Sequence, residues 1–544
     1  MTQSFEEFTP EQEALLGRFV TNTKSSIFAL YNLPEVVKGA LFSRYSRSTL
    51  GLRSLLLREF LLNQEESGLT DMQGGVSETF MKDQLLAIKK AQSFYDRILD
   101  GYGDDSIGEL GGAHLAIENV SMIAAKAIED CRIGGSPLEK STRYIYFDQK
   151  IQGEYLFHRE AVLMTSAWKS LYVNTCNMLF DTYSRLIPPL TTYMTNRYPK
   201  EPEVSTNAYT AAVRAKVLDC VRGLLPASTL TNIGLFGNGR FYEGLLHKMQ
   251  VQNLAELREI GRLSYDELSK VIPSFVRRAD SHHKTHVQYA QFQEAMRSEL
   301  KTLAATVPQE HKTTPSTSSV RLITSDPDAV LKVAAALLYS ETDVGMSDLL
   351  EYCRTMDHEE VAKILDAAAV YRETRRDKSP RALENAVFTF EIITDFGAYR
   401  DLQRHRTLTQ ERQLLTCNLG YYVPKELSES GVEKEYRTAM EAAKVAFDTI
   451  SRELPEEAQY LVPMAYNIRW YFTINLRSLQ WLLELRSQSA GHISYRLVAQ
   501  QMARSVIDAF PQFERFLRFV DYDGHDIGRL DQEIRAEQKK MAST

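Results

Sequence analysis

A weak internal repeat constrains the fold of this chain more than any other feature, because a duplicated sequence has to fold as two related units. Leu224-Leu-Pro226 is followed twelve positions later by Asn238-Gly-Arg240, and Leu461-Val-Pro463 is followed at the same spacing by Asn475-Leu-Arg477. Each pair of landmarks precedes an apolar stretch with helical spacing. We therefore predict two divergent copies of one domain.

Further landmarks support the duplication. Glu109 leads an apolar, strand-like segment in the first half, and Glu384 leads a similar one in the second. The small polar residues and proline from Lys312 to Ser319 are typical of a linker. We expect a first domain at residues 1–314, with a helical insertion near 150–203, and a second domain at 315–544. The predicted fold class is α+β, with two copies of a helix-rich domain that form a pseudo-dimer.

Composition narrows the class of protein. The chain has 544 residues, 44% of them hydrophobic, which suffices for a packed interior. Its net charge of -7 argues against a nucleic-acid polymer as partner, although a few arginines in one cleft would still hold a small anion. The five cysteines form no Cys-x-x-Cys pair, and no apolar run is long enough to span a membrane. We expect a cytoplasmic protein without membrane partners.

Three groups of basic residues are candidates for anion binding. Arg404-His405-Arg406 suits a phosphate or an electron-rich ring edge, but such a triplet is also typical of a solvated helix end. Ser141 and Arg143 project to the same side of an extended chain, as a phosphate clasp or as an ordinary polar edge. Arg222 and Arg486 adjoin apolar helical runs and need anionic partners, either a ligand or a salt bridge.

Metal binding finds little support in the sequence. His282 and His286 have the spacing of two ligands on one helical turn, but no third ligand is near and Lys284 lies between them. We predict no metal site. The sequence also lacks a P-loop, a glycine-rich dinucleotide motif after a strand, an HExxH motif and a GxSxG motif. These absences argue against P-loop hydrolysis, Rossmann-type dinucleotide binding, zinc proteolysis and serine hydrolysis.

In their order along the chain, these motifs resemble those of the flavin-dependent thymidylate synthases. The second half is more similar to the family, over roughly residues 320 to 520, and its matching residues are Ser379, Pro380, Glu384, Phe388, Thr389, Phe390, Arg404, His405, Arg406, Pro463, Asn475, Arg477 and Arg486. The first half is more distant and retains Ser106, Glu109, Glu139, Ser141, Arg143, Tyr144, Arg222, Pro226, Asn238 and Arg240. The ordered set covers most of the chain and is more specific than any single motif.

The resemblance implies a methyltransferase of nucleotide biosynthesis that converts dUMP to dTMP. Methylenetetrahydrofolate would donate the carbon, reduced FAD would supply the hydride, and NADPH usually reduces the flavin. No cysteine nucleophile is needed, because arginine-rich electrostatics and the flavin activate the uracil ring. Family members are homotetramers with active sites at subunit junctions, so we expect the tandem chain to form a homodimer that mimics such a tetramer.

The resemblance also implies roles for individual residues. Arg404 and Arg486 are the candidates for catalysis. The substrate-binding candidates are Glu139, Ser141, Arg143, Arg222 and Arg486. The cofactor-binding candidates are Arg404, His405, Arg406, Ser379, Glu384, Ser106, Glu109, Asn238, Arg240, Asn475 and Arg477.

Each half departs from the family pattern where the other half keeps it. The second half has Leu414 and Thr416 in place of the clasp serine and arginine, and Gln459 in place of the arginine that corresponds to Arg222. The first half has Asp130-Cys131-Arg132 in place of Arg-His-Arg. Such complementary loss predicts a composite site, with the phosphate clasp from the first half and the flavin-side arginines from the second.

Two alternatives to this composite enzyme stay open. One is a catalytically decayed nucleotide-binding or flavin-binding scaffold. It is favoured by His492 and Ser494, which stand where the family carries other residues near the C-terminal helix. The other is a flavin-dependent methylase of another uridine nucleotide, because altered clasp residues would change how the sugar and phosphate are selected.

Overall fold

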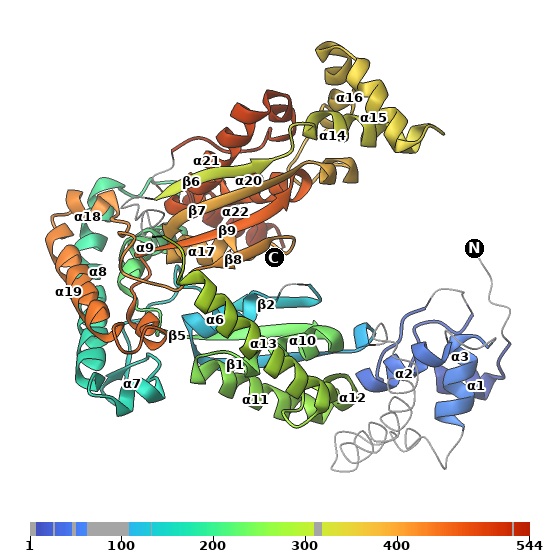
Figure 1. The fold of residues 1–544 in the computed structure, drawn as a ribbon, viewed down its shortest axis with the longest axis horizontal. Helices are drawn as coiled ribbons and strands as arrows, with labels where there is room; N and C mark the ends of the chain where they lie inside the picture. Colours follow the sequence, from blue (N-terminus) through green and yellow to red (C-terminus); the bar gives the residue numbers. More distant parts are fainter. Residues whose placement is uncertain are drawn as a thin grey trace. The chain divides into compact units, whose positions relative to one another are not determined.

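The computed structural model describes residues 7–24, 28–45, 50–62, 108–131, 133–308, 318–524 and 527–543 (Figure 1). Contacts between Cα atoms divide the chain into two compact units. Unit 1 comprises Met1–Glu118, Ala127–Glu139 and Asn232–Val307, and unit 2 comprises Asn119–Lys126, Lys140–Thr231 and Pro308–Thr544. Both contain helices and strands, as the α+β prediction requires. Ser106 and Arg132, which the motif comparison used, lie outside the described residues.

Unit 1 contains most of a three-stranded sheet in the order β1-β5-β2, formed by β1 (Gly112–Ser121), β2 (Gly135–Glu139) and β5 (Leu230–Asn238). β2 and β5 are antiparallel, with Glu139 opposite Ile233. Helix α10 (Gly239–Gln250) packs on this sheet, because the ring of Phe241 lies directly against the backbone of Gly135 and Gly237, where a Cβ atom would leave no room. Among the described residues, unit 1 also has the helices α1 (Pro10–Leu16), α2 (Glu35–Tyr45), α3 (Leu52–Leu55), η1 (Leu56–Leu61), α11 (Ala255–Val271), α12 (Pro273–Val276), η4 (Arg277–Ala279) and α13 (Lys284–Ala304), and α6 (Met122–Glu129) has residues in both units.

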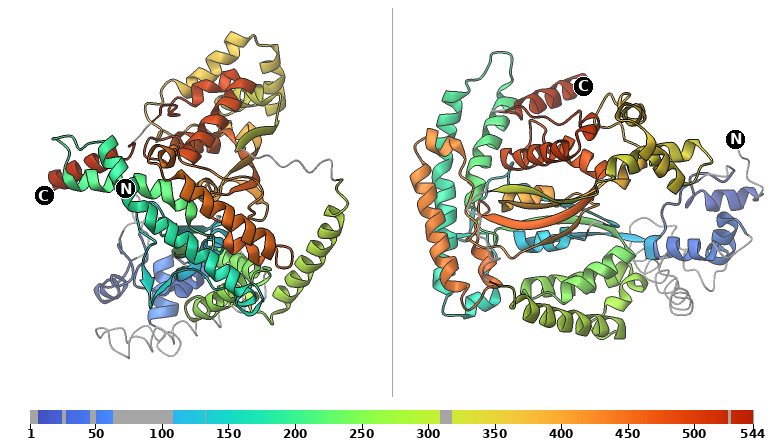
Figure 2. Two further views of the ribbon diagram at one scale, coloured as in Figure 1. Left: turned by 90° about the vertical axis from the view of Figure 1, so that its left-hand side faces the viewer. Right: turned by 45° about the horizontal axis from the view of Figure 1, so that its top comes forward.

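Unit 2 contains a four-stranded antiparallel sheet in the order β6-β7-β9-β8, formed by β6 (Ser319–Ser325), β7 (Val387–Asp395), β8 (Thr409–Arg412) and β9 (Asn467–Asn475). Phe388 and Phe390 alternate with outward-facing residues along β7 and are fully buried. Their rings meet Phe513 and Phe472, respectively. Helices α20 (Leu476–Arg486) and α21 (Ile493–Ala509) cover the sheet (Figure 2).

The other described elements of unit 2 come from both halves of the sequence. In the second half they are α14 (Ala329–Leu338), η6 (Tyr339–Glu341), α15 (Met346–Thr355), α16 (His358–Ala369), η7 (Arg381–Asn385), α17 (Phe396–Leu402), α18 (Lys425–Glu429), α19 (Glu433–Ile450), η8 (Glu457–Leu461), η9 (Pro511–Phe516) and α22 (Leu530–Ser543). From the first half come β3 (Lys150–Ile151), β4 (Glu154–Tyr155), α7 (Ala161–Thr165), α8 (Lys169–Arg197), α9 (Thr206–Val221) and η3 (Arg222–Leu224). Helix α8 lies where the helical insertion was expected, and it packs against α9 and α19.

The repeat landmarks meet inside unit 2. Pro226 and Pro463 form an antiparallel bridge. Ala227 N donates to the Val462 carbonyl at 2.8 Å, and Met464 N donates to the Leu225 carbonyl at 2.9 Å. The two bonds are equivalent under the repeat, because each joins the residue after one proline to the residue before the other. This pairing buries the landmarks against each other.

The two halves also repeat their local contacts. The side chain of Asn238 caps α10 and that of Asn475 caps α20. Arg240 pairs with Glu109 at 2.7 Å, and Arg477 pairs with Glu384 at 2.8 Å. The compact units, however, do not follow position along the chain, since unit 2 takes residues from both sides of position 315. The predicted boundary between residues 314 and 315 separates the two copies of the repeat in the sequence, not the two compact units, and it stays a prediction.

Candidate functional site

Arg143, from the predicted clasp, is buried in unit 2 and held by a carboxylate. Its Nε and Nη2 donate to the two side-chain oxygens of Asp219 on α9, both at 2.7 Å. Its Nη1 lies 3.2 Å from the Ala490 carbonyl oxygen and 3.4 Å from the Tyr495 hydroxyl, in the turn after α20 and in α21. The bidentate pair with Asp219 fixes the orientation of Arg143, and the contacts with Ala490 and Tyr495 join it to the second half of the sequence.

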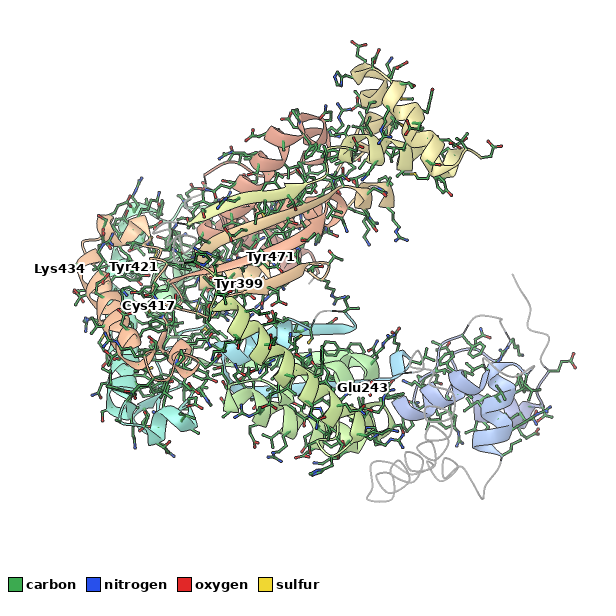
Figure 3. The ribbon with its side chains drawn as sticks, in the orientation of Figure 1. Glu243, Tyr399, Cys417, Tyr421, Lys434 and Tyr471 are labelled. Atoms are coloured by element: carbon green, nitrogen blue, oxygen red, sulfur yellow. The ribbon has the colours of Figure 1, made fainter. Side chains whose placement is uncertain are left out.

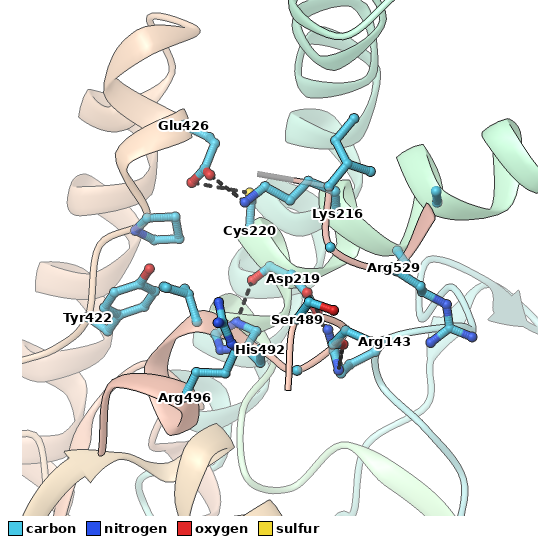
Figure 4. A pocket seen from close by; sticks show the side chains of 18 residues that line it. Arg143, Lys216, Asp219, Cys220, Tyr422, Glu426, Ser489, His492, Arg496 and Arg529 are labelled. Carbon is cyan, nitrogen blue, oxygen red and sulfur yellow. Dashed lines mark hydrogen bonds and ion pairs between the residues drawn. The ribbon is translucent and has the colours of Figure 1, made fainter. Parts of the chain in front are cut away.

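The cavity behind this ion pair is lined by Lys216, Asp219, Glu426 and Arg496, among others (Figure 4). Burial by itself would raise the pKa of Asp219, but Arg143 outweighs it and holds that pKa below its usual range. Lys216 pairs with Glu426 at 2.6 Å. The cavity has a volume of only about 40 Å³, far below that of ordinary ligand pockets. The cavity is therefore too small for a nucleotide.

A second carboxylate, Asp401 on α17, lies among four arginines. Its Oδ1 is 3.7 Å from Arg486 Nη1, and its Oδ2 is 4.0 Å from Arg222 Nη1. Burial raises the pKa of Asp401, but Arg486, Arg404 and Arg222 outweigh burial and lower it, with a smaller contribution from Arg143. The structure therefore brings together arginines that the sequence singled out in both halves.

Two histidines beside this cluster are neutral. Arg486 Nε donates to His405 Nε2 at 3.0 Å, and only an unprotonated ring nitrogen can accept such a bond. Burial and the charge of Arg222 lower the pKa of His492 to about 3. His492 Nδ1 accepts from Ser494 N at 3.2 Å, while Nε2 lies 3.3 Å from the Asp219 carbonyl oxygen. His492 therefore fixes the start of α21 against α9.

The Arg404-His405-Arg406 triplet lines a cleft of about 580 Å³ within unit 2. Other lining residues are Arg372, Arg375, Asp377, Lys378, Ser379, Arg477, Trp481, Glu484 and Arg486. This volume lies within the range of small-molecule pockets. The Ser379 hydroxyl is buried and has no hydrogen-bond partner among the described residues, while the Trp481 indole is half exposed. The cleft thus combines positive charge, an aromatic ring and a polar group that lacks a protein partner.

A buried ion pair supports the wall of this cleft. Arg372 donates to both carboxylate oxygens of Glu484 on α20, at 3.0 and 2.8 Å, and to the Phe516 carbonyl at 3.0 Å. Burial raises the pKa of Glu484, and Arg372 offsets part of that rise. The pair holds α20, and with it Arg486 at its end, against the segment before η7.

Several predicted site residues have structural partners instead of facing the cluster. Ser141 Oγ accepts from Arg143 N at 3.2 Å and so stabilises their turn. Arg477 bonds Glu384 and the Ser379 carbonyl. The ion pair of Glu109 with Arg240, the Asn238 cap, and Glu139 at the end of β2 belong to unit 1. Their predicted roles in binding ligands stay predictions.

The sequence analysis missed the two acidic residues that organise the arginines. Asp219 precedes Arg222 by three positions, and Asp401 precedes Arg404 by the same spacing. An acid one helical turn before an arginine is a recognisable signal for a side-chain pair. In the structure, however, each acid bonds or faces arginines that are distant in sequence. No sequence signal singled out Tyr495 or Trp481.

The five cysteines and one histidine pair are further groups that could take part in chemistry. Burial raises the pKa of all five cysteine thiols, including Cys417 (Figure 3). The His286 ring contacts His247, with their Nδ1 atoms 2.9 Å apart. Over the described residues, no group of three or more His, Cys, Asp or Glu side chains could hold a metal ion. None of the helices described is both long and apolar enough to cross a bilayer.

Comparison with known proteins matches the chain to one family model and to relatives over nearly its whole length. The sequence profile of the family described as thymidylate synthase complementing protein matches residues 64–274 and 321–512. A UPF0159 protein of Chlamydia pneumoniae is 56% identical over 98% of this chain and 98% of its own length. A UPF0159 protein of Thermoplasma acidophilum is 33% identical over 92% of this chain and 99% of its own.

More distant matches include a flavin-dependent thymidylate synthase and a solved methylase structure. A flavin-dependent thymidylate synthase of Geobacter sulfurreducens is 29% identical over 35% of this chain and 82% of its own. The solved structure of a UMP/dUMP methylase from Streptomyces cacaoi, bound with 5-Br dUMP, covers 38% of this chain and 96% of its own at 20% identity, with a TM-score of 0.31. The profile match extends over most of the sequence in two segments, which confirms the family resemblance. The chain belongs to the thymidylate synthase complementing protein family.

Proposed function

We propose that this chain is a flavin-dependent enzyme that methylates a dUMP-like nucleotide. One observation carries the proposal: Arg222 from the first half and Arg486 from the second lie within 4.0 Å of Asp401, and the charges of Arg404 and Arg143 also lower the pKa of that carboxyl. More guanidinium groups than carboxylates gather there, which leaves positive charge for a phosphate monoester. The relatives named flavin-dependent thymidylate synthases support a uridine nucleotide as the ligand.

The cleft at Arg404 and Arg406 fits FAD by its chemistry. The Ser379 hydroxyl would donate to a diphosphate oxygen, and Lys378 and Arg477 would join the arginines in offsetting the diphosphate charge. When bound and reduced, the flavin supplies the hydride that completes the new methyl group, and NADPH restores the reduced form.

The protein's own groups bind and polarise the pyrimidine. Arg404 and Arg486 would place positive charge beside the carbonyl oxygens of the ring and so stabilise an enolate form, in which C5 is nucleophilic. Methylenetetrahydrofolate donates the carbon, and the C5 hydrogen leaves as a proton. Neutral His405 keeps Arg486 oriented through the bond to Nε. None of the cysteines takes part, since burial keeps their thiols protonated.

We propose further that the two halves form a pseudo-dimer and that two chains form a homodimer in the cytoplasm. The paired bonds around Pro226 and Pro463, together with the repeated Glu–Arg ion pairs, support the pseudo-dimer. Light scattering should then give a mass of twice 62.0 kDa. A monomeric mass would contradict the proposed assembly.

The function is tested with the full-length chain, FAD, NADPH, methylenetetrahydrofolate and dUMP tritiated at C5. We expect tritium release into water and formation of dTMP. Arg404→Ala and Arg486→Ala should abolish the release, whereas Lys434→Ala on the exposed face of α19 should not change it. Flavin binding without any tritium release from dUMP would refute the methylase.

One observation favours a second candidate function, a nucleotide-binding or flavin-binding scaffold without methylase activity. Asp219 occupies two N–H groups of Arg143 that a phosphate clasp would use. Binding of FAD and dUMP without turnover would support the scaffold. Methylation of UMP in place of dUMP would instead support the related enzyme that acts on another uridine nucleotide.

A further inference from the structure

Trp481 lines the same cleft of about 580 Å³ as the Arg404-His405-Arg406 triplet, and the proposed function assigns it no role. It lies on α20 and remains 43% exposed, which is high for a tryptophan. Ser379 lines the cleft too; this residue is only 2% exposed, and its hydroxyl lacks a hydrogen-bond partner among the described residues. An uncovered aromatic ring and an unpaired buried hydroxyl in one cleft both indicate a ligand.

Contacts with charged neighbours restrain the Trp481 ring. The guanidinium carbon of Arg375 lies 5.4 Å from the ring centroid, within the range of a cation–π contact. Arg375 also lies close enough to Glu484 for its charge to oppose the rise in the pKa of that carboxyl. Glu484 follows Trp481 by one helical turn and is bound by Arg372 at 3.0 and 2.8 Å. The indole is therefore held in place before a ligand enters, which reduces the entropy that stacking on it would cost.

The cleft residues of α20 have a fixed order along the helix. Because a helix rises by about 1.5 Å per residue, Trp481 lies about 6 Å along the axis from Arg477 and about 7.5 Å from Arg486, between the two. The proposed function assigns the diphosphate of FAD to Arg477 and the pyrimidine to Arg486. The flavin ring is the part of FAD that reacts with the pyrimidine, so it belongs between the diphosphate and the substrate. Trp481 lies at that level.

We propose that Trp481 is the residue on which the flavin ring stacks, and that Arg375 supports the indole as a positioning residue. An indole offers a large aromatic surface, and a planar ring stacked on it gains contact without needing directional bonds. The inference rests on the proposed function and adds to it the side chain that holds the reactive ring of the cofactor.

The first test measures the binding of FAD to the full-length chain by isothermal titration calorimetry. Trp481→Leu should weaken binding by roughly 5-fold to 100-fold, the usual effect of removing an aromatic side chain that stacks on a base. Trp481→Phe keeps an aromatic ring and should recover part of the affinity. Trp168→Leu is the matched control, because the Trp168 indole bonds Glu453 at the surface and is not among the residues that line the cleft. The control should bind FAD as the wild type does.

The second test separates stacking from a merely structural role, through the fluorescence of the bound flavin. An indole in contact with a flavin quenches its emission, by giving an electron to the excited ring and taking it back, whereas a phenylalanine ring is too difficult to oxidise. With FAD fully bound, we expect weak emission from the wild type and from Trp168→Phe, and stronger emission from Trp481→Phe. Equal emission from all three would overturn the inference.

ADP identifies which ring of FAD meets the indole, because it carries the adenine and the diphosphate without the flavin. Trp481→Leu should leave the affinity for ADP unchanged. A loss for ADP as large as the loss for FAD would mean that the indole stacks on adenine, and the inference would be wrong. Unchanged FAD affinity in Trp481→Leu would overturn this inference and leave the proposed function intact. If the wild-type chain bound no flavin, the proposed function itself would fail.

Discussion

The buried pair of Arg372 and Glu484 allows a quantitative test of how the cleft is held together. Arg372→Met removes the guanidinium and keeps a side chain of similar length. Glu484 is fully buried and would lose both of its bonds to Arg372. A buried charge without its partner typically costs about 3 to 5 kcal/mol, so we expect a loss of that size in the free energy of unfolding at pH 8.

The loss should depend on pH in a defined direction. Burial already raises the pKa of Glu484 above its usual value, and Arg372 opposes that rise. Without Arg372 the folded-state pKa rises further, whereas the unfolded value stays the same. A folded-state pKa above the unfolded one gives stability that is present at low pH and lost as pH rises. The deficit of Arg372→Met should therefore shrink as pH falls from 8 to 5.5, by up to about 1.4 kcal/mol per pH unit.

Tryptophan fluorescence in urea measures this effect selectively. The three tryptophans, Trp168, Trp470 and Trp481, all belong to unit 2, as does the ion pair. Arg354→Met is the control, because its ion pairs are exposed at the surface and should contribute less than about 1 kcal/mol. The reasoning would be refuted if Arg372→Met were as stable as this control at pH 8, or if its deficit did not change with pH.

Three further predictions address the site itself. Arg143→Ala should weaken dUMP binding and spare the flavin, whereas Arg406→Ala should release the flavin, as followed by its absorbance; equal flavin loss in both would contradict a divided site. The pKa of His492 is about 3, against 6.5 for an ordinary histidine. The unfolded chain therefore gains a proton there that the folded protein lacks, so stability should fall as pH drops from 6.5 towards 3, and His492→Gln should flatten this slope in urea titrations at pH 7 and 5. Iodoacetamide at pH 7 should leave tritium release unchanged, because burial raises the pKa of every cysteine; inactivation would reveal a reactive thiolate.

Local sequence patterns were sufficient to predict the repeated elements. The landmarks at Asn238 and Asn475 were expected to precede helical stretches, and in the structure both side chains cap helices. The ordered motifs were specific enough to identify the family, and α8 lies where a helical insertion was expected, near residues 150–203. These features depend on residues close together in sequence, so neighbouring side chains and the backbone determine them.

The partners of the charged residues were decided only by the tertiary structure. The sequence singled out Arg143, Arg222 and Arg486 as guanidiniums that need anions, but it could not tell a ligand from a protein carboxylate. The fold brings Asp219 to Arg143 at hydrogen-bond distance and leaves Asp401 farther from Arg222 and Arg486. Electrostatic energy depends on distance and burial in three dimensions, and residues hundreds of positions apart acquire those only when the chain packs.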